Sequence, residues 1–151
     1  MYWRIGAAYR RRPAAHNRRD FRRVVGQGPA PGLLAFDGDE PVGWCQLTPR
    51  AALPWLDGRW PGARGSRDTW ALSCLYVKVG WRRRGVSEQL IRAAIAVARR
   101  ARATALEAYP LDGARSPSAS GTGYVSSFAR AGFRVVARRS AARPVMRLAL
   151  R

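Results

Sequence analysis

The segment Val77–Ser87 reads Val-Lys-Val-Gly-Trp-Arg-Arg-Arg-Gly-Val-Ser and joins an apolar stretch to an amphipathic one. The apolar residues before it predict a buried strand over Thr69–Val77. Backbone N–H groups at the start of a helix attract an anion, and Gly85 lets a phosphate approach the backbone closely. The three arginines before Gly85 add charge and paired donors. We therefore predict a pyrophosphate-binding turn, the alternative being a solvated turn in an arginine-rich chain.

The residues after this turn have the periodicity of a half-buried helix over residues 85–101. Its apolar positions recur every three or four residues, at Val86, Leu90, Ala94, Val97 and Ala101. A short apolar strand follows over residues 104–108. Strand, helix and strand in this order predict a parallel crossover unit.

The N-terminal part predicts helices followed by a hairpin. An arginine-rich helical stretch is interrupted at Pro13, and Phe21, Val24 and Val25 are expected on its buried face. Strands over residues 33–36 and 42–47 flank an Asp-Gly turn signal. Residues 48–68 contain Pro49, Pro54 and Pro61 and are predicted to form a long connection.

The C-terminal part predicts a short helix between a loop and two strands. Residues 110–123 are rich in glycine, serine and proline and are expected to be mobile. The helix covers residues 124–131, and Gly132 fits its C-terminal stop. The last strands cover residues 133–138 and 144–150. The two long loops are expected to shape an acceptor pocket.

Composition sets the class of protein. A chain of 151 residues suits one domain over residues 1–151, with residues 1–32 as an N-terminal helical segment. The formal charge is +19, and Lys78 is the only lysine. Arginine, alanine, glycine and proline share GC-rich codons, so the charge reflects either genome composition or a selected anion-binding surface.

The two cysteines and the hydropathy indicate where the protein resides. Cys45 and Cys74 lie in strand-like segments without a histidine cluster, so no metal site is expected. No apolar run approaches the roughly 20 residues that span a bilayer. We expect a cytoplasmic protein without membrane contact, in which both cysteines are small buried groups.

Two motifs resemble the GNAT superfamily of acetyl-CoA dependent N-acetyltransferases. Arg82-Arg83-Arg84-Gly85-Val86-Ser87 is similar to the family's Arg or Gln, any, any, Gly, any, Gly or Ala, with Ser87 in the last place. Phe128-Ala129-Arg130-Ala131-Gly132-Phe133 resembles the family's helix that ends in Gly-Phe. The resemblance implies a mixed α/β fold: a mostly antiparallel central sheet with one parallel crossover, flanked by helices. Too few residues precede Leu33 for the family's usual first strand and two helices, so we expect either that the first strand is missing or that Met1 is an internal start.

The resemblance also implies how the coenzyme binds. Acetyl-CoA would place its pyrophosphate on the backbone of the turn and its pantetheine arm along the preceding strand. The coenzyme-binding residues expected from it are Leu75, Val77, Arg82, Arg83, Arg84, Gly85, Val86 and Ser87. The acetyl group would pass directly to a primary amine of a small molecule, peptide or protein, without a metal.

The residues expected to transfer protons match the family's pattern less well than the coenzyme-binding motif does. Glu107 is the sole carboxylate inside an apolar strand beside the expected cleft and is the candidate base, the equal alternative being an ion pair with an arginine. Phe128 stands where many members of the family carry a tyrosine that protonates the departing thiolate. Tyr124, on a neighbouring face of the same helix, is the candidate replacement, and simple packing is its alternative.

Two other functions stay open from the sequence. An arginine-rich nucleic-acid-binding module would use the clusters at residues 10–23, 82–84 and 134–147, although no nucleic-acid motif is present. An acetyltransferase acting on an amine carried by RNA combines both ideas. A homodimer is compatible with either function.

Overall fold

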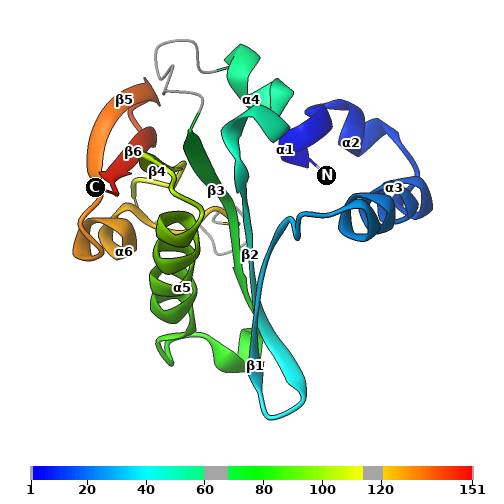
Figure 1. Cartoon of the computed structure of the whole chain (residues 1–151), viewed down its shortest axis with the longest axis horizontal. Helices are drawn as coiled ribbons and strands as arrows, with labels where there is room; N and C mark the ends of the chain where they lie inside the picture. Colours follow the sequence, from blue (N-terminus) through cyan, green and yellow to red (C-terminus); the bar gives the residue numbers. More distant parts are fainter. Residues whose placement is uncertain (1, 60–67, 114–120, 151) are drawn as a thin grey trace.

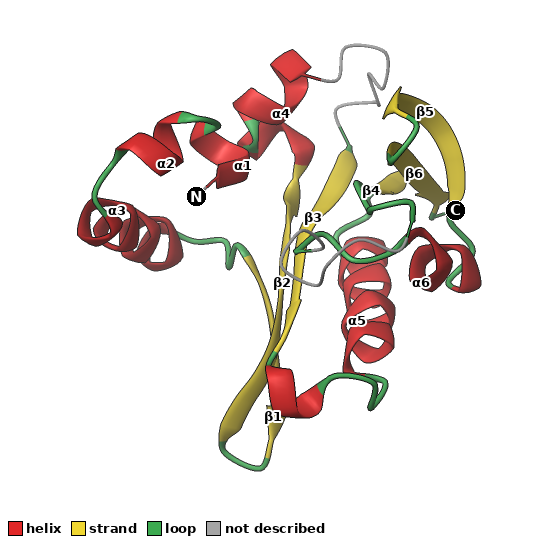
Figure 2. Cartoon of the chain, turned by 180° about the vertical axis from the view of Figure 1, so that it is seen from behind, coloured by secondary structure: helices red, strands yellow, loops and turns green. Residues whose placement is uncertain are grey.

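A mixed β-sheet with helices on both faces forms the body of the molecule (Figures 1 and 2). This computed structural model describes residues 2–59, 68–113 and 121–150. The strands are β1 (Gly32–Asp37), β2 (Glu40–Pro49), β3 (Thr69–Val77), β4 (Ala105–Ala108), β5 (Arg134–Ser140) and β6 (Arg143–Ala149). They lie in the order β1-β2-β3-β4-β6-β5, and only β3 and β4 are parallel. The predicted fold class is confirmed.

Two long helices and several short ones cover the sheet. They are α1 (Tyr2–Ile5), α2 (Ala8–Arg11), α3 (Ala14–Gln27), α4 (Pro54–Arg59), α5 (Val86–Arg100) and α6 (Val125–Arg130). Short 3-10 turns cover Arg50–Ala52 and Val79–Trp81. Among the described residues no strand precedes Gly32, so β1 is an edge strand. None of the helices in the described ranges is long and apolar enough to cross a membrane.

Two helical segments, α3 and α4, differ from the prediction. Pro13 separates α2 from α3 as expected, but Val25 is 51% exposed and does not belong to a buried face. Residues 48–68 were expected to form no element, yet they contain α4, and residues 60–67 lie outside the described part. Trp55 of α4 contacts the rings of Tyr2 and Trp3, so aromatic packing joins α4 to α1.

The core lies mainly between the sheet and α5. Buried Val86, Leu90, Ile91, Ala94 and Ala98 form the inner face of this helix. A Cβ added at Gly43 of β2 would lie 2.9 Å from a Val86 methyl group, so glycine allows the helix to pack closely on the sheet. Phe128 and Phe133 extend the same core to α6 with their rings 5.2 Å apart.

The parallel strands β3 and β4 separate partway along their length. Their pairing runs from Thr69 opposite Ala105 to Leu72 opposite Ala108. The register of β3 against β2 shifts at the next residue, which leaves Ser73 as a bulge, and β3 then continues to Val77. Beyond the bulge the N–H of Leu75 donates to the carbonyl oxygen of Gly121 at 2.9 Å. The segment at Gly121 therefore takes the place of β4 beside the second half of β3.

The cysteines face opposite sides of the sheet and are free thiols. Cys45 is fully buried in the core beneath α5, and burial raises its pKa from 9.0 to about 12. Burial likewise raises the pKa of Cys74. Both thiols are thus expected to stay protonated at neutral pH, as buried apolar groups do.

Alkaline pH should reveal the buried thiol of Cys45. Because its pKa is higher in the folded chain, its contribution to stability is complete below pH 9 and declines as the pH rises toward 12. The free energy of unfolding should then fall with a slope of up to about 1.4 kcal/mol per pH unit from this thiol. Urea unfolding of the wild type and of Cys45→Ala between pH 8 and 11 measures the slope. Parallel curves for the two proteins would contradict the assignment.

Candidate active site

A cavity of about 680 Å³ opens where β3 parts from β4. Its walls come from the end of β3, the turn before α5, the glycines at residues 121 and 123, and α6. The lining residues are Leu75, Tyr76, Val77, Trp81, Arg82, Arg83, Gly85, Val86, Ser87, Glu88, Gly121, Gly123, Tyr124, Ser127 and Arg130. We call it the strand-end cavity. It brings together the sequence-predicted residues except Arg84 and Glu107, which are not among its lining residues.

The turn before α5 supplies backbone donors. Arg83 and Gly85 both have left-handed backbone angles, with φ of 63° and 80°. Only glycine adopts this conformation without strain, so Gly85 fits the position directly before the helix. Helix α5 begins at Val86, and its first bond back to Gly85 comes from the N–H of Glu88 at 3.0 Å. The N–H groups at the start of α5 have no partner within the helix, and N–H groups in this position attract negative charge.

The three arginines of the turn do not act alike. Arg82 lines the cavity, and its Nε donates to the carbonyl oxygen of Val77 at 3.3 Å. Arg83 also lines the cavity. The guanidinium of Arg84 lies over the Trp81 ring, 4.9 Å from its centroid. Two of the three arginines therefore line the cavity, while the third makes a cation–π contact with Trp81.

The opposite wall depends on a close approach of two segments. Gly123 has φ of 77°, and a Cβ added there would lie 2.8 Å from a Leu75 methyl group and 3.0 Å from the Phe128 ring. Glycine thus allows this segment to lie against β3. Arg130 donates to Glu88 Oε1 at 2.7 Å, an ion pair that joins α6 to α5 at the cavity. The sequence analysis expected residues 110–123 to shape an acceptor pocket and named Tyr124, but it did not predict the Glu88–Arg130 ion pair of this wall.

Tyr124 and Phe128 have different surroundings although both belong to the α6 region. Tyr124 is half-buried, precedes the first residue of α6 and lines the strand-end cavity. Phe128 is fully buried and packs against Phe133. The hydroxyl-bearing side chains that line the cavity from this region are therefore those of Tyr124 and Ser127.

Glu107 lies fully buried on β4, near the point where β3 and β4 separate. Its Oε2 accepts hydrogen bonds from Arg50 Nη1 and from the Tyr109 hydroxyl, both at 2.8 Å. Its Oε1 accepts from Arg147 Nε at 3.1 Å and Nη2 at 2.5 Å. Four donors fill the acceptor capacity of one carboxylate. The structure thus shows the arginine pairing that the sequence left as an alternative for this residue.

No metal centre is evident in the parts of the chain that the structure describes, since no three histidine, cysteine, aspartate or glutamate side chains gather there. The site instead offers backbone N–H groups, guanidiniums and a phenol. Such groups bind and orient an anionic ligand, and they stabilise charge that develops on oxygen or sulfur.

Comparison with known protein families gives one match. Residues 2–116 match the family described as acetyltransferase (GNAT) family. No curated protein sequence matches the chain closely enough to count as a relative. Several solved structures share the fold at low sequence identity.

Three of these solved structures illustrate the likeness. The ribosomal-protein-alanine N-acetyltransferase of Brucella melitensis is 19% identical, with a TM-score of 0.64 over 91% of this chain and 80% of that one. The yncA protein of Salmonella typhimurium, solved with its cofactor acetyl-CoA, is 18% identical, with a TM-score of 0.62 over 92% and 75%. The paia N-acetyltransferase of Thermoplasma acidophilum, in complex with coenzyme A, is 15% identical, with a TM-score of 0.55 over 83% and 65%.

Removing the buried carboxylate should destabilise the fold strongly. Glu107→Ala removes the fully buried carboxylate that pairs with the nearly buried Arg50, and breaking a buried ion pair typically costs about 3–5 kcal/mol. The matched control is Glu40→Ala, which removes an exposed partner of Lys78 and should cost about 0–1 kcal/mol. Urea unfolding at neutral pH compares the two. Equal losses would show that the Glu107 network contributes no more than a surface ion pair.

Proposed function

We propose, from the premise that the chain belongs to the GNAT family of acetyltransferases, that it transfers an acetyl group from acetyl-CoA directly to a primary amine. The observation that carries this proposal is the strand-end cavity, in which the Gly85 turn, the start of α5 and Arg82 surround one open space. A coenzyme with a pyrophosphate and a long, uncharged arm fits such a site. The acceptor is a small molecule, a peptide or a protein.

The coenzyme would occupy the cavity in two parts. Its pyrophosphate would bind the backbone N–H groups between Arg82 and Ser87, with the guanidiniums of Arg82 and Arg83 as counter-charges. Arg84, held over Trp81, would add positive charge nearby. The arm would lie along Leu75 and Val77. A carbonyl oxygen of the arm would there replace the Gly121 carbonyl oxygen as the acceptor of the hydrogen bond from the Leu75 N–H.

The chemical step needs one proton released and one gained. The neutral amine attacks the thioester carbonyl carbon, so a carbon–nitrogen bond forms and the carbon–sulfur bond breaks. The amine gives up a proton, and the departing thiolate takes one. A backbone N–H near Leu75 would stabilise the oxygen that becomes negative during the attack.

Tyr124 is the group that we propose for protonating the thiolate. It lines the strand-end cavity from the α6 side, whereas Phe128 has no acidic proton and is buried in the core. Glu107, the candidate base, has its four acceptor positions occupied by Arg50, Tyr109 and Arg147. It would have to release one of these donors before it could accept a proton. The geometry favours a positioning role for Glu107, with the amine proton passing to water.

The comparisons support the general reaction and leave the acceptor open. The yncA structure contains acetyl-CoA, and the paia structure contains coenzyme A. The name of the Brucella melitensis enzyme gives an alanine of a ribosomal protein as its acceptor. These proteins make acetyl-CoA the coenzyme to test first on this chain.

Acetyl-CoA should stabilise the folded chain through the turn before α5. At about one hundred times its dissociation constant it should add roughly 2.7 kcal/mol to the free energy of unfolding. The double variant Arg82→Ala/Gly85→Glu should lose most of this gain, since it removes one cation and adds an anion. Arg99→Ala, an exposed position on α5, is the control. Thermal shift with acetyl-CoA measures the effect, and a wild type unaffected by millimolar coenzyme would refute the proposal.

Turnover should separate the roles of Tyr124 and Glu107. Tyr124→Phe should lower kcat by about 100-fold, within the range of a general acid, while acetyl-CoA affinity stays close to wild type. Glu107→Gln should leave the shape of the pH profile of kcat unchanged, because the carboxylate is not the base. Measuring kcat against pH for both variants tests this. Loss of the acidic limb in Glu107→Gln, where kcat rises with pH as a base loses its proton, would show that the carboxylate is the base.

A further inference from the structure

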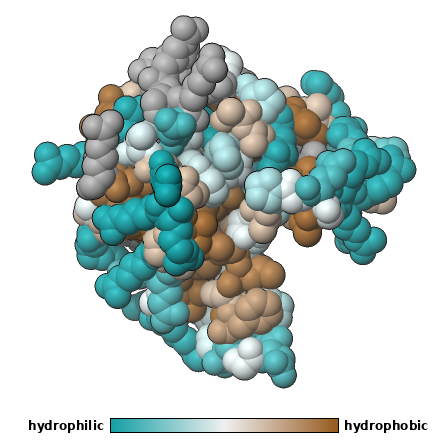
Figure 3. All heavy atoms as spheres, viewed as in Figure 1, coloured by the Kyte–Doolittle hydropathy of each residue, from teal (hydrophilic) through white to brown (hydrophobic). Residues whose placement is uncertain are grey.

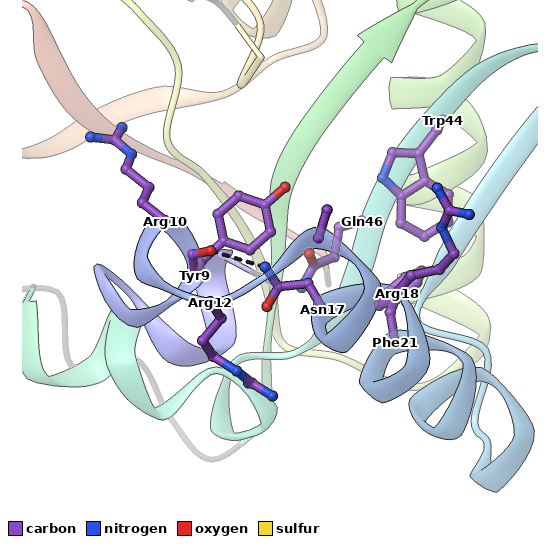
Figure 4. Close-up of a pocket in the computed structure, with 9 residues that line it drawn as sticks. Tyr9, Arg10, Arg12, Asn17, Arg18, Phe21, Trp44 and Gln46 are labelled. Atoms are coloured by element: carbon purple, nitrogen blue, oxygen red, sulfur yellow. Dashed lines mark hydrogen bonds between the residues drawn. The ribbon is translucent and has the colours of Figure 1, made fainter.

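A second cavity, of about 600 Å³, lies on the other side of the sheet, between the N-terminal helices and β2 (Figure 4). Tyr9, Arg10, Arg12, Ala14, Asn17, Arg18, Phe21, Trp44 and Gln46 line it. We call it the N-terminal cavity. The proposed function uses none of these residues, and the sequence analysis named Arg10, Arg12 and Arg18 only within the arginine cluster of the alternative nucleic-acid-binding module.

Two buried amides in this cavity have polar atoms without partners. Asn17 is 7% exposed, and its Nδ2 donates to the carbonyl oxygen of Tyr9 at 2.9 Å (Figure 4). This bond fixes the amide and leaves Oδ1 without a hydrogen-bond partner. Gln46 is 3% exposed, and its Nε2 has no partner either. Buried polar groups are normally paired. The acceptor Asn17 Oδ1 and the donor Gln46 Nε2 could therefore both bind a ligand that carries one donor and one acceptor.

The rim of the N-terminal cavity is positively charged. Arg10, Arg12 and Arg18 line it, whereas no carboxylate does. Arg12 pairs with Asp20, and that hydrogen bond lowers the pKa of the Asp20 carboxyl group. Arg18 forms no ion pair with any carboxylate in the described ranges. This rim favours an anion and disfavours a second positive charge.

Strand pairing places this cavity next to the strand-end cavity. Across β2 and β3, Trp44 lies opposite Tyr76 and Gln46 lies opposite Cys74. Tyr76 lines the strand-end cavity, and so does Leu75, the neighbour of Cys74. Paired residues of antiparallel strands have Cα atoms about 5 Å apart. A ligand on Trp44 and Gln46 would therefore lie one strand away from the proposed position of the thioester.

We propose that the N-terminal cavity is the acceptor site and that the acceptor is a small amine carrying a negatively charged group. This inference rests on the proposed acetyltransferase function. The anionic group binds at the rim near Arg18, while Arg10, which lies over the Tyr2 ring, adds positive charge at the other end (Figure 4). Polar atoms of the acceptor pair with Asn17 and Gln46, and its apolar part packs on the aromatic rings. The shared chemistry is an anionic amine, whose charge is a carboxylate or a phosphate.

The same arginines also assist the reaction. A nearby positive charge disfavours the ammonium form and so lowers the pKa of a bound amine. More of the acceptor is then neutral and able to attack the thioester. The requirement for a general base becomes weaker, which agrees with the occupied carboxylate of Glu107.

Matched pairs of amines test the proposal. Tyrosine and tyramine differ by a carboxylate, and O-phosphoethanolamine and ethanolamine differ by a phosphate. We expect kcat/KM to be about tenfold or more higher for the anionic member of at least one pair, as a charge-assisted hydrogen bond allows. The pair that shows the preference identifies the anion. Coenzyme A release, followed with a thiol reagent, measures turnover.

Variants connect this preference to the cavity. Arg18→Gln should remove most of the preference for the anionic amine, and it should slow the uncharged partner much less, because only the pKa effect on the amine is lost there. Arg99→Gln, an equal change of charge at an exposed position on α5, should preserve the preference. Gln46→Met should lower turnover several-fold and raise Tm, because it removes an unpaired buried donor.

A binding measurement decides the matter if no amine of the panel is acetylated. With coenzyme A present, calorimetry should show that N-acetyltyrosine or N-acetylated O-phosphoethanolamine binds the wild type and not Arg18→Gln. No binding of either anion, a preference for the uncharged amines, or equal effects of Arg18→Gln and Arg99→Gln would overturn the proposal. Thermal shift with acetyl-CoA on the same samples shows separately whether the coenzyme function holds.

Discussion

The separation of β3 from β4 after Leu72 is the constraint on which the rest of the structure depends. The bulge at Ser73 ends the parallel pairing, so the second half of β3 loses its neighbour and leaves backbone groups to be satisfied. Gly121 supplies one partner, and Gly123 allows its segment to lie close enough to do so. The strand-end cavity, the anion site at α5 and the proposed path of the coenzyme arm all follow from this opening.

A buried charge network holds the base of that opening. Glu107 lies opposite Ala71 of β3 and Arg147 of β6, one residue before the last paired position of β4. Burying these charges costs desolvation free energy, which the four hydrogen bonds to the carboxylate offset only in one arrangement of the strands. The network therefore specifies register more than it adds stability. It keeps β4 paired up to Ala108, and the chain diverges beyond it.

Local pattern predicted most of the fold, and its failures have physical causes. Periodicity and glycine placement located β3, α5 and α6, because these signals lie within one segment. Helix α4 was missed because Pro54 was taken as an interruption, although proline is favourable at the first position of a helix. The backbone turn at Gly85 could also be predicted, because its signal likewise lies within one segment. The Arg50–Glu107 pair, separated by 57 residues, could not, since it depends on tertiary packing.

The arginines have different roles that the net charge does not show. Arg50 and Arg147 both pair with the single carboxylate of Glu107, and Arg130 is paired with Glu88. Exposed charges farther apart than about 8 Å are largely screened at physiological ionic strength, so the total of +19 matters less than which guanidiniums face each cavity. Arg83 faces one and Arg18 the other, with β3 between the two cavities. Positive charge on both sides of the proposed reaction centre would favour the neutral amine and the thiolate together, so one electrostatic arrangement promotes both halves of the transfer.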